Sequence, residues 1–159
     1  MPDRSKGVLT WNSKEVAKAL KISVEDVKEY FTDGRRVSFI VERRVSKEII
    51  KGWLAPSEGS GFDLIDPSRG KWEVRSISRG GIYFCPSRMV GSGRKFDEPG
   101  FLKKLSEIKG YILSDIESFP SIPIWIVSKQ DVLRWWKDGS LGINTKISRD
   151  KILDLVKAR

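Results

Sequence analysis

Two carboxylates and two cations that could act together on a phosphate lie within residues 61–78: Asp63, Glu73, Lys71 and Arg75. A pair of carboxylates beside a basic side chain can hold a hard divalent metal ion over a phosphate. The same spacing also occurs by chance in a chain with 32% charged residues, where it describes an ordinary hairpin with a solvated face. The spacing alone leaves both interpretations open.

Two short strands joined by a turn are predicted to position these side chains. Residues 62–66 and 71–77 alternate apolar and charged positions, and residues 67–70, PSRG, have the composition of a turn. Successive strand side chains point to opposite faces. One face of the second strand is expected to carry Lys71, Glu73 and Arg75. The other is expected to carry mostly Trp72, Val74 and Ile77. If the strands pair, Asp63 can sit beside Glu73.

The residue types exclude several kinds of catalytic site. The chain has no histidine, which excludes Ser-His-Asp and Cys-His catalysis, histidine metal ligands and histidine bases. Cys85 is the only cysteine, which excludes an intrachain disulfide and a cysteine-based zinc site. Catalysis would therefore depend on carboxylates, lysine, tyrosine or a hard metal ion held by oxygen ligands.

The length and charge indicate one domain that binds a polyanion. A chain of 159 residues can form one adequate core. No apolar run approaches the ~20 residues of a membrane helix, and the N-terminus lacks the apolar core of a signal peptide, so we expect a soluble cytoplasmic protein. The net charge of +9 is typical of a domain that binds nucleic acid.

The order of elements predicts an α/β (α+β) fold with a mixed central β-sheet flanked by helices. After the hairpin we expect a helix, two strands and two helices, over residues 99–109, 111–116, 122–127, 129–137 and 148–157. The second of these strands is almost entirely apolar, so we expect it to be buried on both faces. The inward side chains of the first helix are predicted to be Phe101, Leu102, Leu105 and Ile108.

The N-terminal part predicts two helices within residues 12–31, the first capped by Asn12 or Ser13 and the second by Ser23. The pair resembles a helix-turn-helix unit, and a plain helical hairpin that packs or dimerises also fits.

Gly34 is expected to end the second helix, and Ser46 to begin a further helix that runs to Leu54. We therefore divide the chain into an N-terminal helical segment, residues 1–36, and a core, residues 37–159.

Two basic stretches could contact DNA. Arg43 and Arg44 lie among apolar positions and could face phosphates, or they could be solvated charges. Residues 86–95 are rich in Gly, Ser and Arg, and such loops can approach a groove closely. Within this loop Arg88 and Arg94 could each read a guanine edge, and a mobile surface loop is the alternative.

Asp63, Glu73 and Arg75 resemble the motif of the PD-(D/E)xK nucleases, which is an Asp at the start of one strand and Glu-x-Lys on the next. Among these nucleases the chain is most similar to the small PvuII-type restriction endonucleases, because Val74 and Ser76-Ile77 match their strand. Residues 122–139 resemble the last strand and following helix of that type. The resemblance extends from about residue 40 to residue 150, and the first 35 residues do not match.

The resemblance implies a restriction-endonuclease-like fold in which Asp63 and Glu73 bind one or two Mg²⁺ ions, with Glu58 as a helper. In the family the metal lowers the pKa of a bound water, and the lysine holds that water and steadies the developing charge. Such proteins are homodimers that cut both strands of a palindromic site in double-stranded DNA. A cognate DNA methyltransferase would fit this picture, although nothing in the chain shows one.

Arg75 departs from the family lysine. A guanidinium stays protonated in proteins and cannot act as a base. Arg75 could perform the electrostatic part of the role, Lys71 could reach the water instead, or the protein could bind DNA and cut it poorly.

Base recognition must also differ from that of the PvuII type, which uses histidines after the catalytic strand. We expect the region from Arg79 to Lys95 to read the bases, with Ser87, Arg88 and Arg94 foremost, and arginine favours guanine.

The sequence therefore predicts a magnesium-dependent type II restriction endonuclease. The alternative is a non-catalytic or weakly catalytic DNA-binding protein that uses the helix-turn-helix. A third hypothesis, a nuclease selective for DNA junctions, shares the catalytic residues but ignores sequence.

Overall fold

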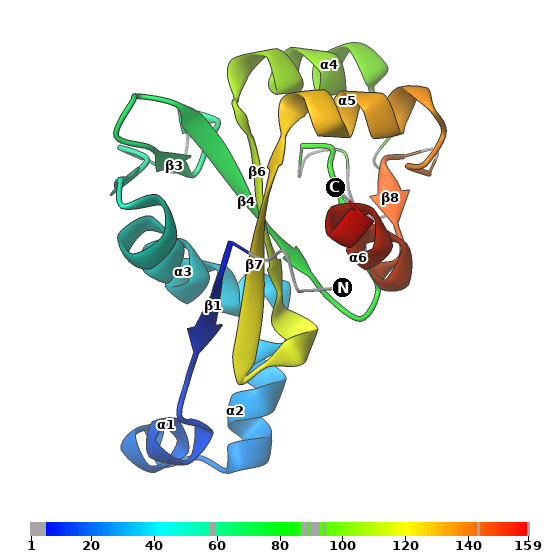
Figure 1. The fold of residues 1–159 in the computed structure, drawn as a ribbon. Helices are drawn as coiled ribbons and strands as arrows, with labels where there is room; N and C mark the ends of the chain where they lie inside the picture. Colours follow the sequence, from blue (N-terminus) through cyan, green and yellow to red (C-terminus); the bar gives the residue numbers. More distant parts are fainter. Residues whose placement is uncertain are drawn as a thin grey trace.

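The computed structural model describes residues 6–57, 60–86, 89, 93, 95–142 and 144–158 (Figure 1). Its large sheet contains β1 (Gly7–Thr10), β2 (Trp53–Leu54), β3 (Leu64–Ile65), β4 (Lys71–Ile77), β6 (Gly110–Asp115) and β7 (Ser121–Ser128). The order across this sheet is β1-β7-β6-β4-β3-β2. A small antiparallel sheet pairs β5 (Ile82–Tyr83) with β8 (Lys146–Ile147).

Helices cover both faces of the large sheet (Figure 1). The helices on one face are α1 (Ser13–Leu20), α2 (Val24–Phe31) and α3 (Gly34–Val45). Those on the other face are α4 (Glu98–Glu107), α5 (Lys129–Lys137) and α6 (Arg149–Ala158). The predicted mixed sheet flanked by helices is confirmed. Among the helices that the structure describes, none is both long enough and apolar enough to cross a membrane.

The central strands follow the sequence pattern closely. The strands predicted over residues 111–116 and 122–127 are β6 and β7. All six residues of β6 are buried, and Ile124 and Trp125 of β7 are both buried although they point to opposite faces. Ile124 belongs to the core beneath α1–α3 and Trp125 to the core beneath α4–α6, so β7 is buried on both faces as predicted.

Strand β4 pairs unequally along its two edges. On one edge it pairs with parallel β6 from Trp72 to Ile77. On the other edge it pairs with antiparallel β3 only at Lys71 and Trp72. From Glu73 onward this second edge has no strand partner in the described part of the chain. A cleft can therefore open along it.

The N-terminal helices have the predicted caps. The Asn12 side chain accepts a hydrogen bond from the Glu15 N–H, and Ser23 forms a capping box with Asp26. The predicted role of Gly34 is wrong, because Asp33 caps α3 and Gly34 is its first residue. A Cβ at Gly34 would lie 3.3 Å from the Ser76 Cβ, so the glycine lets α3 approach β4 closely.

The predicted boundary between residues 36 and 37 lies inside α3. Residues before it contribute β1 to the large sheet, and Val27 and Phe31 share a core with Ile112 and Ile122. The N-terminal segment therefore packs as part of the same layered unit.

The helix predicted from Ser46 to Leu54 is wrong in its bounds, because residues 46–50 are helical but continue α3, and residues 53–54 form a strand. Helix α3 continues through Ser46 as a short π-helix, Ser46–Ile50, which ends at Lys51 with a φ of 55°. The chain then forms edge strand β2, where Trp53 is 58% exposed. Apolar residues at helical spacing suggested a helix, but the left-handed Lys51 ends it. A Cβ at Gly52 would lie 2.0 Å from the Ile65 carbonyl oxygen, so only glycine permits this approach.

Asp66 holds the turn between β3 and β4. Its Oδ1 accepts hydrogen bonds from the N–H groups of Ser68 (2.9 Å) and Gly70 (2.8 Å) and from the Ser68 hydroxyl (2.8 Å). Its Oδ2 accepts from the Trp72 indole (2.8 Å) and from the Lys109 ammonium (3.1 Å). Burial would raise the pKa of Asp66, but these hydrogen bonds to the ionised form outweigh it and lower the pKa well below 3.8.

Asp66→Asn should lower the free energy of unfolding at pH 7 by about 1–3 kcal/mol, because an amide nitrogen in place of Oδ2 cannot accept from Trp72 or Lys109. Since the folded-state pKa is depressed, the advantage of the wild type is complete above pH 3.8 and shrinks as the pH falls below it. Urea unfolding at pH 7 and pH 3 measures both values. An equal loss at the two pH values would contradict the assignment.

Candidate active site

Asp63 immediately precedes β3 and lies beside the edge of β4 that has no strand partner. Its N–H donates to the Trp72 carbonyl oxygen (2.9 Å), and its side-chain Oδ2 accepts from the Val74 N–H (2.8 Å). The carboxylate thus takes the place of the strand partner that Val74 lacks. Continuing the β3–β4 register by one residue sets Asp63 opposite Glu73, as the sequence predicted.

Glu73 is a buried carboxylate held between two cations. It is 7% exposed. Its Oε2 lies 3.0 Å from Nη2 of Arg75, and its Oε1 lies 2.5 Å from Nζ of Lys104. Lys104 comes from α4 and also donates to the Gly61 carbonyl oxygen. A buried charge is stable only when it is paired, and here two elements supply the pairing.

The environment of Asp63 opposes its ionisation. Burial raises the pKa of Asp63, and the neighbouring charge of Glu73 raises it further. The hydrogen bond from Val74 and the charges of Arg75 and Lys104 offset this only in part. Two carboxylates close together in a poorly solvated site repel each other, and a cation between them would relieve that repulsion.

Arg75 is fixed at the centre of the site. Its Nη2 donates to the Cys85 carbonyl oxygen (3.1 Å) as well as contacting Glu73. Its Nε is buried and has no hydrogen-bond partner among the described residues. Ile77 lies on this same face and belongs to the core beneath α4–α6, which corrects the prediction that it points mostly away.

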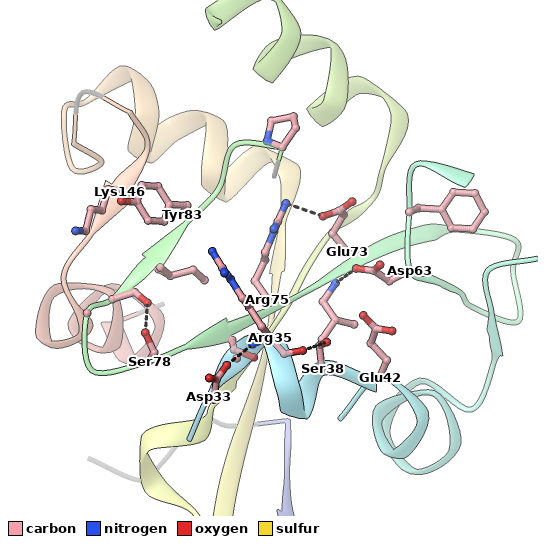
Figure 2. Close-up of a pocket in the computed structure, with 18 of the residues that line it drawn as sticks. Asp33, Arg35, Ser38, Glu42, Asp63, Glu73, Arg75, Ser78, Tyr83 and Lys146 are labelled. Carbon is pink, nitrogen blue, oxygen red and sulfur yellow. Dashed lines mark hydrogen bonds and ion pairs between the residues drawn. The ribbon is translucent and has the colours of Figure 1, made fainter. Parts of the chain in front are cut away.

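A cavity of 1220 Å³ lies along the free edge of β4. Figure 2 shows Asp63, Glu73 and Glu42 toward one end, Arg35 and Arg75 in the middle, and Tyr83 and Lys146 toward the other end. Helix α3 forms one wall through Arg35, Ser38 and Glu42. The small β5–β8 sheet forms the end of the cavity that lies away from Asp63 and Glu73 (Figure 2).

Sequence reasoning missed Lys104 and Glu42. Lys104 lies three residues after the buried Phe101 and four before the buried Ile108, so helical spacing places it on the inward face. Leu102, which was predicted to point inward, is 38% exposed. Glu42 is missed because the sequence predicts that a helix ends at Gly34, whereas α3 begins there and contains Glu42.

The other predicted site residues that the structure describes do not line the cavity. Lys71 lies over the Phe62 ring, with Nζ 5.1 Å from its centroid. Arg79 is 91% exposed and pairs with Glu117. The remaining three are Arg43, which stacks on Phe39, Arg44, which pairs with Glu48, and Lys95, which is exposed. The predicted residues Glu58, Ser87, Arg88 and Arg94 lie outside the described residues.

The donor set fits a magnesium ion that is only partly held by protein. Within the described ranges, no three or more Cys, Asp or Glu side chains gather in a way that could hold a metal ion. Mg²⁺ commonly binds through one or two carboxylates, substrate phosphates and several waters, and Asp63 and Glu73 offer such a pair. Binding would require Glu73 to exchange at least one of its bonds to Arg75 and Lys104.

No protein-family model matches the chain, and a comparison with curated proteins finds no match.

Asp63→Asn should raise the melting temperature at pH 7 in metal-free buffer. Because the pKa of Asp63 is raised above its ordinary value of 3.8, the folded state loses stability as the pH rises from 3.8 through the folded-state pKa. Asparagine cannot ionise, so it removes this loss, and its side-chain oxygen still accepts from the Val74 N–H. The gain should shrink as the pH falls toward 3.8.

Thermal unfolding between pH 4 and pH 8 measures this difference. Asp154→Asn, which changes an exposed carboxylate on α6, is the matched control and should leave the melting temperature unchanged. A lower melting temperature for Asp63→Asn at pH 7 would show that the site does not disfavour the ionised form of this carboxylate.

Proposed function

We propose that this protein is a magnesium-dependent DNA endonuclease with a PD-(D/E)xK-type site in a restriction-endonuclease-like fold. The observation that carries the proposal is the pair Asp63 and Glu73, set side by side in a cleft that also contains Arg75 and Lys104. The net charge of +9 supports double-stranded DNA as the substrate.

Each residue then has a role that follows from its contacts. Asp63 and Glu73 would hold Mg²⁺, which when bound lowers the pKa of a coordinated water and neutralises charge on the phosphate. Arg75, fixed by Glu73 and Cys85, supplies a permanent positive charge for the phosphate.

Lys104 is the best candidate for the role of the family lysine. Its ammonium lies 2.5 Å from Glu73, whereas Lys71 lies over Phe62 and outside the cavity. An ammonium is compact, has three donors and can orient a water beside a carboxylate, which the planar guanidinium of Arg75 does less well. This assignment favours an active nuclease over a protein that binds DNA and cuts it poorly.

The helix-turn-helix alternative is disfavoured by the charge of α2. The exposed side chains of this helix include Glu25, Asp26 and Glu29 but only one cation, Lys28. A recognition helix lies between rows of phosphates, where three carboxylates would be repelled.

Cutting both strands at a short site would require two clefts, which a homodimer would supply.

Wild-type protein should linearise plasmid DNA in Mg²⁺ and leave it intact in EDTA. Glu73→Gln should reduce cutting at least about a thousandfold yet preserve DNA binding, because without a metal ion a carboxylate near a phosphate does not contribute to binding. Lys104→Ala should reduce cutting about 10²–10³-fold, whereas the matched control Lys71→Ala should stay within about threefold of wild type.

Gel assays of supercoiled plasmid measure these rates, and sequencing of the product ends tests for a defined site. Ends at random positions on plasmid, with preference for branched DNA, would favour the junction nuclease. Tight binding without Mg²⁺-dependent cutting would refute the nuclease proposal.

A further inference from the structure

Two of the cations that line the cavity have no carboxylate partner among the described residues. Arg75 and Lys104 are both paired with Glu73. Arg35 of α3 and Lys146 of β8 line the same cavity, and neither forms an ion pair within the described part of the chain. In Figure 2 the guanidinium of Arg35 points into the cavity between Arg75 and the Tyr83–Lys146 wall.

The position of Arg35 is not explained by helix stability. It lies in the first turn of α3, two residues after the N-cap Asp33, and this turn contains no acidic residue. A cation in the first turn is unfavourable because it meets the positive end of the helix dipole. Asp33 pairs with Arg36 and accepts from the backbone N–H of Arg35, so the Arg35 side chain is left to face the cavity.

Lys146 is held in place by backbone pairing. It lies opposite Tyr83 in the β5–β8 sheet, and its Nζ is 5.5 Å from the Tyr83 ring centroid. The preceding Thr145 is fully buried with a φ of 59°, and its carbonyl oxygen accepts from the Phe84 N–H. A Cβ at Gly81 would lie 2.1 Å from the Ile147 carbonyl oxygen, so the turn before β5 packs tightly against β8.

We propose that Arg35 and Lys146 form a second phosphate site, which binds the DNA-backbone phosphate next to the one that is attacked beside Asp63 and Glu73. The proposal rests on the proposed function. Each DNA strand carries one negative charge about every 3.4 Å of helix axis, so a strand lying along this cavity would place more than one phosphate beside it. The acidic end repels such a phosphate, whereas two unpaired cations attract it.

DNA binding measured without metal tests the second phosphate site independently of catalysis. A fluorescent duplex in EDTA is titrated with full-length wild type and with Arg35→Ala/Lys146→Ala across a range of salt concentrations. The double variant should bind about 10–100-fold more weakly, and the slope of log K against log salt should fall in magnitude by about 1 to 2. The charge-conserving pair Arg35→Lys/Lys146→Arg should restore most of the binding.

The matched control is Lys14→Ala/Lys18→Ala, which removes two exposed cations from α1, outside the cavity. It should bind within about threefold of wild type at the same salt. Equal losses in the two double variants would overturn the second phosphate site, because the effect would then be one of net charge. Circular dichroism and melting temperatures verify that both variants are folded.

Cutting of plasmid by wild type in Mg²⁺ separates the two proposals. If wild type cuts but the Arg35/Lys146 variant binds like the control, the second phosphate site is wrong and the nuclease stands. If wild type does not cut but this variant still loses binding selectively, the nuclease is wrong and the phosphate site stands.

Discussion

The structure depends on stabilising one buried negative charge. Glu73 lies on the central strand β4 with 7% of its surface exposed, and such a carboxylate is tolerated only if cations compensate it. Arg75 comes from the same strand, and Lys104 comes from α4 in the crossover to β6. The packing of α4 against the sheet and the ionisation of the site are therefore coupled. A divalent cation would take over part of the neutralisation that Lys104 and Arg75 provide.

The second constraint is the short pairing of β3 with β4. Because β3 contains only Leu64 and Ile65, β4 keeps a free edge over which the cavity opens, and the side chain of Asp63 takes over one backbone hydrogen bond. This arrangement disfavours the charged form of Asp63 but places it beside Glu73. The tightly bonded Asp66 turn stabilises the same hairpin at its other end. Stabilising hydrogen bonds are thus concentrated in the turn, and the carboxylate whose ionised form is disfavoured lies where a bound cation would stabilise it.

Much of the fold and the centre of the site could be predicted from local patterns. Alternation around a turn was enough to place Asp63 near Glu73, since strand register follows from pairing. The missing parts depend on helix boundaries and on side-chain direction. The left-handed Lys51 precedes a tertiary contact, the close approach of Gly52 to the Ile65 carbonyl oxygen, and no local pattern shows that the predicted helix stops there. The capping of α3 by Asp33 is local, but the prediction that Gly34 ends a helix hides it, and Glu42 is missed for that reason. Lys146 lies on a two-residue strand, which is too short to show any periodicity.

Whether Asp63 and Glu73 together hold a divalent cation can be measured by anomalous diffraction from crystals soaked in Mn²⁺. One strong peak is expected within about 2.5 Å of an oxygen of each carboxylate, with the bond between Lys104 and Glu73 lengthened or broken. A map without a peak at this position, in crystals at saturating Mn²⁺ and with Glu73 still bound to both Arg75 and Lys104, would contradict binding of a cation by this pair.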